Sequence, residues 1–225
     1  MERQKALLIV GSPKGLKSTS HVLGSTLLEK LKSGGMVAEE IIVGAALHSE
    51  ESLEKMQGAL EEADLVVFSF PLFVDQVPAP LIKTLELIAH RRAARRPEQQ
   101  QRIMAIVQCG FPENIHNQPA CGTMRQFARE AGFVWAGILA MGMGGFIGGR
   151  PLEKAGGVVR NVVKALDLAA AALLRGEAIP DEAAEIMGKP LMPRWLYMVA
   201  ANWGFRRQLK KRGTRKQADA RPYEA

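Results

Sequence analysis

Five short apolar segments alternate with helical ones along this chain, and this alternation restricts the possible folds more than any other feature. These segments are residues 6–10, 37–43, 64–70, 102–108 and 134–141, and the second, which contains Glu39 and Glu40, is expected at an edge of the sheet. Runs of this length are typical of strands in a parallel sheet, most of them buried on both faces. Apolar residues recur at helical spacing in residues 18–31, 50–62, 80–90, 121–131 and 152–175. The pattern predicts an α/β domain, a doubly wound five-stranded parallel sheet with right-handed crossovers and helices on both faces.

Length and charge divide the chain into a domain and an appendage. We expect residues 1–176 to form the α/β domain, residues 177–212 a C-terminal helical extension, and residues 213–225 a disordered basic tail. The net charge of +7 belongs to the appendage, because ten Lys and Arg residues stand against two acids from Lys189 onward. Residues 1–188 carry 20 basic and 21 acidic residues. A nearly neutral domain gives no reason to expect nucleic-acid binding, despite the high pI.

The cysteines and the N-terminus predict a cytoplasmic protein. Cys109 and Cys121 have neither the spacing of metal ligands nor the number that a disulfide framework needs, which suits a reducing compartment. The charged N-terminus leads directly into the first strand, so no signal peptide is expected. No apolar stretch approaches the ~20 residues that a membrane-spanning helix requires. The four histidines are scattered and predict no metal site.

The segment after the first strand has the composition of a phosphate-binding loop. A helical pattern begins there near Ser18, and the first-turn N–H groups and the dipole of a helix attract anions. The hydroxyl and amine groups that could bind a phosphate monoester are those of Ser12, Lys14, Ser18, Thr19 and Ser20. The spacing matches neither a Walker A loop nor a dinucleotide-binding fingerprint. The simpler alternative is an ordinary strand-to-helix turn with Ser18 as N-cap.

Two further irregular loops follow the third and fourth strands. Residues 71–80 contain three prolines between a buried strand and a helix, and residues 109–114 follow the next strand. In the strand order 2-1-3-4-5, the loops after strands one, three and four are neighbours at the carboxyl edge, where open α/β sheets bind their ligands. Three chemically unusual loops at one edge therefore predict a ligand site.

These three loops together resemble those of the flavodoxin-like NAD(P)H-dependent FMN reductase and oxidoreductase family. Gly11-Ser12-Pro13-Lys14 with Ser18-Thr19-Ser20 is similar to the family's phosphate loop, usually Gly-Ser-Pro-Arg followed by a Ser/Thr pair. The stretch from Pro71 to Pro78 resembles the Pro-Leu-Tyr stretch that lies against the flavin ring, and Cys109-Gly110-Phe111-Pro112-Glu113 resembles a Gly-Phe-Pro-Glu loop. The resemblance covers residues 5–175. Lys14 stands where Arg is usual, and the clustered cysteines of an iron–sulfur centre are missing, which excludes that branch of the family.

The resemblance implies a flavodoxin-like fold that binds FMN, with NAD(P)H as co-substrate and a small electron acceptor such as a quinone or nitroaromatic compound. It implies these cofactor-binding residues: Ser12, Lys14, Ser18, Thr19, Ser20, Pro71, Leu72, Phe73, Val74, Cys109, Gly110 and Phe111. A flavin carries the hydride chemistry itself, which accounts for the lack of an obvious acid–base pair or nucleophile. One alternative is an FMN-binding electron carrier or regulatory flavoprotein without fast NAD(P)H turnover. Another is a flavin-free protein that binds a different phosphorylated ligand.

The C-terminal extension is not accounted for by a flavodoxin-like domain. Residues 195–205 are apolar nearly all round and include two tryptophans, whereas residues 206–212 are mostly basic. The segment is too short to span a bilayer but could lie on an anionic membrane surface. We favour packing against the core or against the second subunit of a homodimer, because aromatic helices usually bury their apolar side in protein. A separate basic run, Arg91, Arg92, Arg95 and Arg96, is expected to be the solvated end of a helix.

Overall fold

The computed structural model describes residues 3–94 and 100–220. Its sheet consists of β1 (Lys5–Val10), β2 (Val37–Ile42), β3 (Leu65–Pro71), β4 (Arg102–Gln108) and β5 (Val134–Met141). The strand order is β2-β1-β3-β4-β5, and every neighbouring pair is parallel. This confirms the predicted doubly wound sheet, and each strand begins and ends within one residue of its apolar segment.

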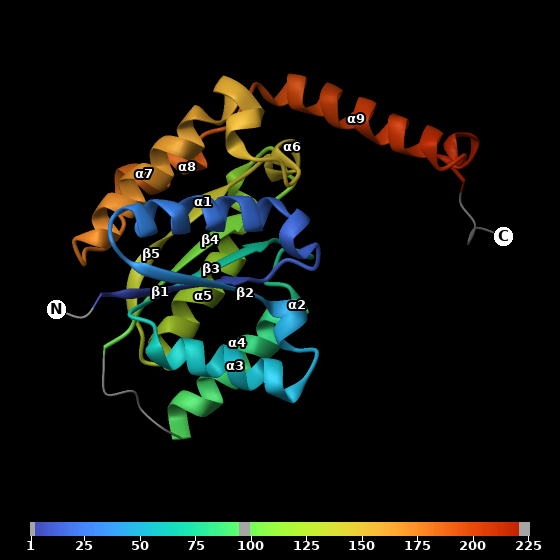
Figure 1. Ribbon diagram of the computed structural model, residues 1–225. Coiled ribbons are helices and arrows are strands. Elements are labelled where there is room, and N and C mark those ends of the chain that lie inside the picture. Colours follow the sequence, from blue (N-terminus) through green and yellow to red (C-terminus); the bar gives the residue numbers. More distant parts are fainter. Residues whose placement is uncertain (1–2, 95–99, 221–225) are drawn as a thin grey trace. The chain divides into compact units, whose positions relative to one another are not determined.

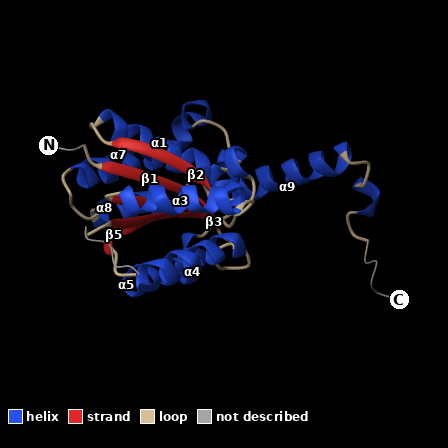
Figure 2. Ribbon diagram, turned by 60° about the horizontal axis from the view of Figure 1, so that its bottom comes forward, coloured by secondary structure: helices blue, strands red, loops and turns tan. Residues whose placement is uncertain are grey.

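Helices cover both faces of the sheet, as Figures 1 and 2 show. One face carries α1 (Thr19–Ser33), α7 (Arg160–Leu174) and α8 (Asp181–Gly188). The other carries α3 (Glu50–Glu62), α4 (Ala79–Ala94) and α5 (Gln118–Glu130). Shorter elements connect them: α2 (Val43–Ala46), α6 (Gly144–Ile147), and the 3-10 segments η1 (Gly15–Lys17), η2 (Asn114–Asn117) and η3 (Leu152–Val159). Leu8 joins the first core and Leu7 the second, because successive strand side chains point to opposite faces.

The long helix expected over residues 152–175 is broken into two parts. The first part is the 3-10 segment η3, and α7 begins only at Arg160. Within η3, Gly156 has a φ of 72°, which a continuous right-handed helix does not allow. The prediction of a single helix is therefore wrong, and glycine at this position is the local cause.

The chain before α8 runs close against β5. The Ile179 N–H donates to the carbonyl of Ala136 at 2.7 Å. A β-carbon on Gly137, whose φ is 122°, would lie 2.9 Å from the β-carbon of Ile179, so glycine permits the approach. The chain divides into two compact units, Met1–Leu191 and Met192–Ala225, so α8 belongs to the unit that contains the sheet.

Arg92 is buried, although we expected a solvated helix end. Its side chain is only 8 % exposed, and its Nε donates to the carbonyl of Ala131 at 2.6 Å. The guanidinium lies 3.6 Å from the centroid of the Phe133 ring and donates through Nη1 to Gln101 Oε1. Burial lowers the pKa of Arg92. The expectation is wrong for Arg92, because carbonyls, an amide and an aromatic ring replace the water around it.

The same cluster joins the ends of several elements. Gln101 Nε2 donates to the carbonyls of Leu60 and Ala63, at the end of α3, at 2.6 and 2.7 Å. Arg91, the preceding residue, is partly exposed and pairs with Glu61 at 2.7 Å. Arg95 and Arg96 lie outside the described residues. The cluster stabilises the amino edge of the sheet, opposite the edge that carries the candidate ligand site.

The second unit contains α9 (Arg194–Lys211) and the single turn η4 (Arg215–Gln217). Tyr197 of α9 is buried, whereas Trp195 and Trp203 are 69 % and 66 % exposed. The η4 turn lies in the stretch expected to be disordered. Within residues 3–94 and 100–220, no helix combines the length and the apolar character needed to cross a membrane.

Candidate functional site

Four loops meet at the carboxyl edge of the sheet, because β3, β4 and β5 end in register and β1 ends two residues earlier. Val10 of β1 pairs with Ser69 of β3, Pro71 of β3 pairs with Gln108 of β4, and Gln108 pairs with Met141 of β5. The loops that follow are residues 11–18, 72–78, 109–113 and 142–149. The first three are the loops that the sequence singled out, and the fourth is rich in glycine.

The first loop leads into a capped helix N-terminus. Ser18 has extended backbone angles, and its Oγ accepts a hydrogen bond from the His21 N–H at 3.0 Å. Thr19 and Ser20 form the first turn of α1, so their N–H groups have no acceptor within the helix. Lys14 is exposed on the same loop. Together with the helix dipole, these groups give a site that favours an anion.

The serines of this loop lie beneath its surface. Ser12 and Ser18 are buried, and the Oγ of Ser12 lies 3.4 Å from the N–H of Lys14. Ser20 is completely buried, and its carbonyl accepts from the hydroxyl of Ser69 at 2.7 Å. These contacts fix the backbone of the loop, while Lys14 extends its charge toward solvent.

The glycine-rich segment is attached both to the first loop and to β4. Thr19 Oγ1 donates to the carbonyl of Gly144 at 2.9 Å. A β-carbon on Gly144 would collide with the side-chain amide of Gln108, and one on Gly149 would collide with the backbone carbonyl of Lys17. Gly149 therefore requires glycine, because it has a φ of 78° and lies against backbone, whereas a side chain at Gly144 would have to displace the amide of Gln108.

A strained two-residue turn forms the tip of the second loop. Phe73 and Gln76 exchange both of their backbone hydrogen bonds, at 2.9 and 3.0 Å. Between them, Val74 and Asp75 have φ values of 48° and 55°, in the left-handed region that β-branched residues rarely adopt. Gln76 anchors the turn, because its Oε1 accepts from the hydroxyl of Thr123 at 3.1 Å. Strain of this kind costs about 1–3 kcal/mol and is concentrated at binding and active sites.

The third loop presents a second half-exposed aromatic ring. Phe111 and Phe73 are each 49 % exposed. The ring of Phe111 lies against His116, with 4.4 Å between the centroids. The Phe111 carbonyl accepts from the Met143 N–H at 2.7 Å, which attaches this loop to the glycine-rich segment. A β-carbon on Gly110 would meet open space, so this position borders solvent.

Cys109 is a buried thiol below the third loop. Its Sγ lies 3.6 Å from the side-chain nitrogen of Asn117, and 2 % of the residue is exposed. Burial raises the pKa of Cys109, and hydrogen bonds from its surroundings oppose this only in part. Cys121 is also buried, with its pKa raised by desolvation. Neither sulfur has the exposed, electropositive surroundings of a reactive cysteine.

The predicted binding residues thus fall into two sets at one edge of the sheet. Those with exposed or half-exposed positions are Lys14, Pro71, Leu72, Phe73, Val74, Gly110 and Phe111. Those that are buried are Ser12, Ser18, Thr19, Ser20 and Cys109. Gln108 and Ser69 are not among the predicted residues, although each is a polar residue near the carboxyl end of an otherwise apolar strand. In the part of the chain that the structure describes, no three His, Cys, Asp or Glu residues are grouped as metal ligands would be.

A comparison with protein families agrees with this architecture. The sequence model of a family described by its flavodoxin-like fold matches residues 4–138, more than half of the 225 residues. A comparison with the curated proteins finds no match.

Solved structures share the fold at low sequence identity. An FMN-dependent NADH-azoreductase from Bacillus anthracis, in complex with FMN, is 15% identical with a TM-score of 0.53, over 76% of this chain and 99% of that chain. A flavone reductase is 15% identical with a TM-score of 0.54, over 82% and 70% of the two chains. The Trp repressor binding protein from Bacillus subtilis is 15% identical with a TM-score of 0.53, over 72% and 95%. At such identities the likeness concerns the fold.

Proposed function

Because the chain belongs to the family of proteins with this flavodoxin-like fold, we propose that it is an FMN-dependent oxidoreductase. In this proposal NAD(P)H is the co-substrate, and the acceptor is a small molecule such as a quinone or nitroaromatic compound. The observation that carries the proposal is the arrangement at the carboxyl edge. There a capped helix N-terminus, a strained exposed turn and two half-exposed phenylalanines follow parallel strands that end within two residues of one another. The FMN-bound azoreductase and the flavone reductase, which share the fold, support the same class of function.

The start of α1 fits the phosphate end of FMN. The first-turn N–H groups of Thr19 and Ser20 are directed along the helix axis toward its N-terminus, where a phosphate would accept from them. Lys14 adds a flexible positive charge rather than the planar, bidentate contact of an arginine. The hydrogen bond from Thr19 to Gly144 would hold this end of the site in place before the cofactor arrives.

The second and third loops fit the ring of a flavin. Phe73 and Phe111 offer aromatic surface that is not yet covered by protein. The N–H groups of Val74 and Asp75 are not used by the hydrogen-bonded pair that closes the turn, so they can donate to the polar edge of a ring. The anchor from Gln76 to Thr123 would keep this turn from moving away.

The chain itself would bind and orient rather than react. FMN, when bound, supplies the hydride chemistry, so a protein acid, base or nucleophile is not required. The Cys109 thiol takes no part in this proposal, because its burial and raised pKa keep it protonated at neutral pH. A cytoplasmic location is part of the same proposal, supported by two unpaired buried thiols.

The visible absorption spectrum of the purified protein, reconstituted with FMN and desalted, tests the cofactor. We expect a two-banded flavin spectrum that survives desalting. Replacing Lys14 by alanine should weaken FMN binding by about tenfold, since one charge is lost beside the phosphate. The exposed Lys83, far along the chain on α4, gives the control variant Lys83→Ala, which should bind FMN as the unmodified protein does.

Anaerobic addition of NADH or NADPH to the reconstituted protein tests the activity. Rapid bleaching of the flavin by either nucleotide, followed by recovery when a quinone is added, is the expected result. Failure to retain FMN would overturn the whole proposal and leave a site for another phosphorylated ligand. Retained flavin that neither nucleotide bleaches would overturn the enzymatic part alone and favour an electron carrier.

A further inference from the structure

The second unit joins an apolar half-helix to a basic one. The first part of α9 presents large apolar side chains that are exposed: Trp195, Leu196, Met198, Val199, Trp203 and Phe205. The second part and the turn after it present cations: Arg206, Arg207, Lys210, Lys211, Arg212, Arg215 and Lys216. Arg194 adds one more at the start, and no acid occurs between Met192 and Ala218. A segment of this kind lacks the charged residues of both signs that ordinarily solvate a surface helix.

One face of α9 changes from apolar to basic along its length. Leu196, Val199, Trp203, Arg206 and Lys210 are spaced by three and four residues, so they lie on the same side of the helix. The apolar members of this set are all exposed. A surface that covers this face must therefore accept apolar side chains at one end and cations at the other.

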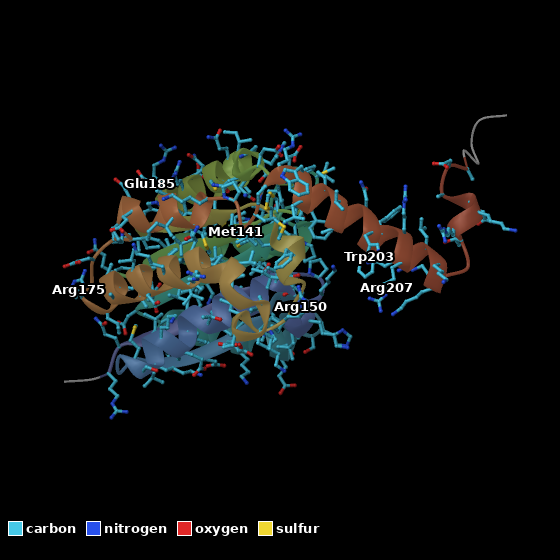
Figure 3. All side chains as sticks on the ribbon, turned by 90° about the horizontal axis from the view of Figure 1, so that it is seen from above. Met141, Arg150, Arg175, Glu185, Trp203 and Arg207 are labelled. Atoms are coloured by element: carbon cyan, nitrogen blue, oxygen red, sulfur yellow. The ribbon has the colours of Figure 1, made fainter. Side chains whose placement is uncertain are left out.

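Trp203 and Arg207 lie where the apolar half of α9 meets its basic half. They stand one turn apart, as Figure 3 shows, and the Arg207 guanidinium carbon lies 5.6 Å from the centroid of the Trp203 ring. A tryptophan beside an arginine at the end of an apolar stretch is typical of the boundary between hydrocarbon and water.

We propose that α9 docks the protein on an anionic bilayer surface. The seven exposed cations of residues 206–216 complement anionic headgroups, and the exposed tryptophans, leucine and valine complement the acyl boundary beneath them. A nucleic acid would engage the basic half and leave the apolar half in water. A second copy of the chain would cover the apolar half but would bring an equally basic helix, or a domain whose residues 1–188 are nearly neutral. Of these three surfaces, only the bilayer contacts both the apolar and the basic half of α9.

Cosedimentation of the full chain with vesicles tests the docking. We expect at least about tenfold more binding to vesicles of phosphatidylcholine with one third phosphatidylglycerol than to phosphatidylcholine alone, and a loss of binding in high salt. The variant Arg206→Gln/Arg207→Gln/Lys210→Gln should lower binding by about tenfold or more. The matched control, Lys83→Gln/Arg125→Gln/Arg129→Gln, removes the same number of exposed charges from the first unit and should bind as the unmodified chain does.

The apolar half requires its own variant. Trp195→Ser/Trp203→Ser should also abolish most vesicle binding while leaving the circular dichroism of the chain and its FMN spectrum unchanged. Equal binding to both vesicle types, or no effect of the charge variant, would overturn the proposal. So would a dimer in light scattering that the tryptophan variant dissociates while vesicles bind neither form. A further contrary result is binding to duplex DNA and not to vesicles, with DNA binding lost in the charge variant but kept in the tryptophan variant. That result would show that α9 binds nucleic acid instead.

Discussion

The side-chain amide of Gln108 fills the space that a β-carbon on Gly144 would occupy. Gln108 ends β4, and Gly144 belongs to the glycine-rich segment that follows β5. The carbonyl of the same glycine accepts the Thr19 hydroxyl from α1. Gly144 thus connects the glycine-rich segment with the end of β4 and with the start of α1.

Replacing Gly144 by alanine should displace Gln108 and loosen the site. We expect a loss of about 1–3 kcal/mol in the free energy of unfolding, the usual cost of forcing an extra methyl into a packed position, and weaker FMN retention. Urea unfolding and flavin absorbance after desalting measure the two effects. Gly122→Ala is the control, because a β-carbon there meets open space on α5. The control should be slightly stabilised, since alanine favours a helix over glycine.

Replacing Val74 by asparagine should stabilise the apoprotein. Val74 has a φ of 48° and is almost fully exposed, so the change relieves backbone strain without removing packing. Asparagine tolerates this region far better, and we expect a gain of about 1 kcal/mol in urea unfolding. The exposed Val37 lies in β2 with ordinary strand geometry, so Val37→Asn should give no gain. A Val74→Asn variant less stable than the parent would contradict the assigned strain.

The two buried thiols should make stability fall in alkaline solution. Burial raises the folded-state pKa of Cys109 and Cys121 above their ordinary value of 9.0, so the unfolded chain releases these protons first. The contribution of the protonated thiols to the free energy of unfolding is fully present below the pKa of the unfolded chain. It is lost as the pH rises through the pKa of the folded protein. Urea midpoints between about pH 8 and about pH 10 should therefore decline less steeply in Cys109→Ala/Cys121→Ala than in the parent. Identical slopes would show that the thiols titrate normally in the fold.

Replacing Arg92 by methionine should destabilise the domain without affecting the cofactor. The change keeps an apolar stem but leaves the carbonyl of Ala131 and the amide of Gln101 without their donor. We expect a loss of about 2–4 kcal/mol in the free energy of unfolding. Arg91→Met removes a partly exposed pair with Glu61 and a hydrogen bond to Gln57, and it should cost about 1 kcal/mol, less than the Arg92 variant. Equal losses in the free energy of unfolding for the two variants would mean that the buried contacts of Arg92 do not stabilise the domain.

The sheet could be predicted from the sequence because four of its strands are distinct apolar runs between helical patterns, and β2, which contains Glu39 and Glu40, lies at the edge. The same reasoning located the three loops, since parallel strands bring their carboxyl ends to one edge. Arg92 was misjudged because its solvation comes from carbonyls at the ends of other elements, which a local pattern does not reveal. The turn at Val74 was not predictable either, because valine opposes the left-handed conformation that the structure imposes. The break at Gly156 could have been suspected from the adjacent glycines within the expected helix.

The hydrogen bond between Thr19 and Gly144 has a consequence for how the protein is made. Its partners are 125 residues apart, and at about 5–20 residues per second a ribosome needs about 6–25 s to synthesise the chain between them. During that interval the first loop has emerged without the segment that fixes it. If the chain binds FMN as proposed, a fragment that ends before Gly144 should therefore bind it more weakly than the full chain does.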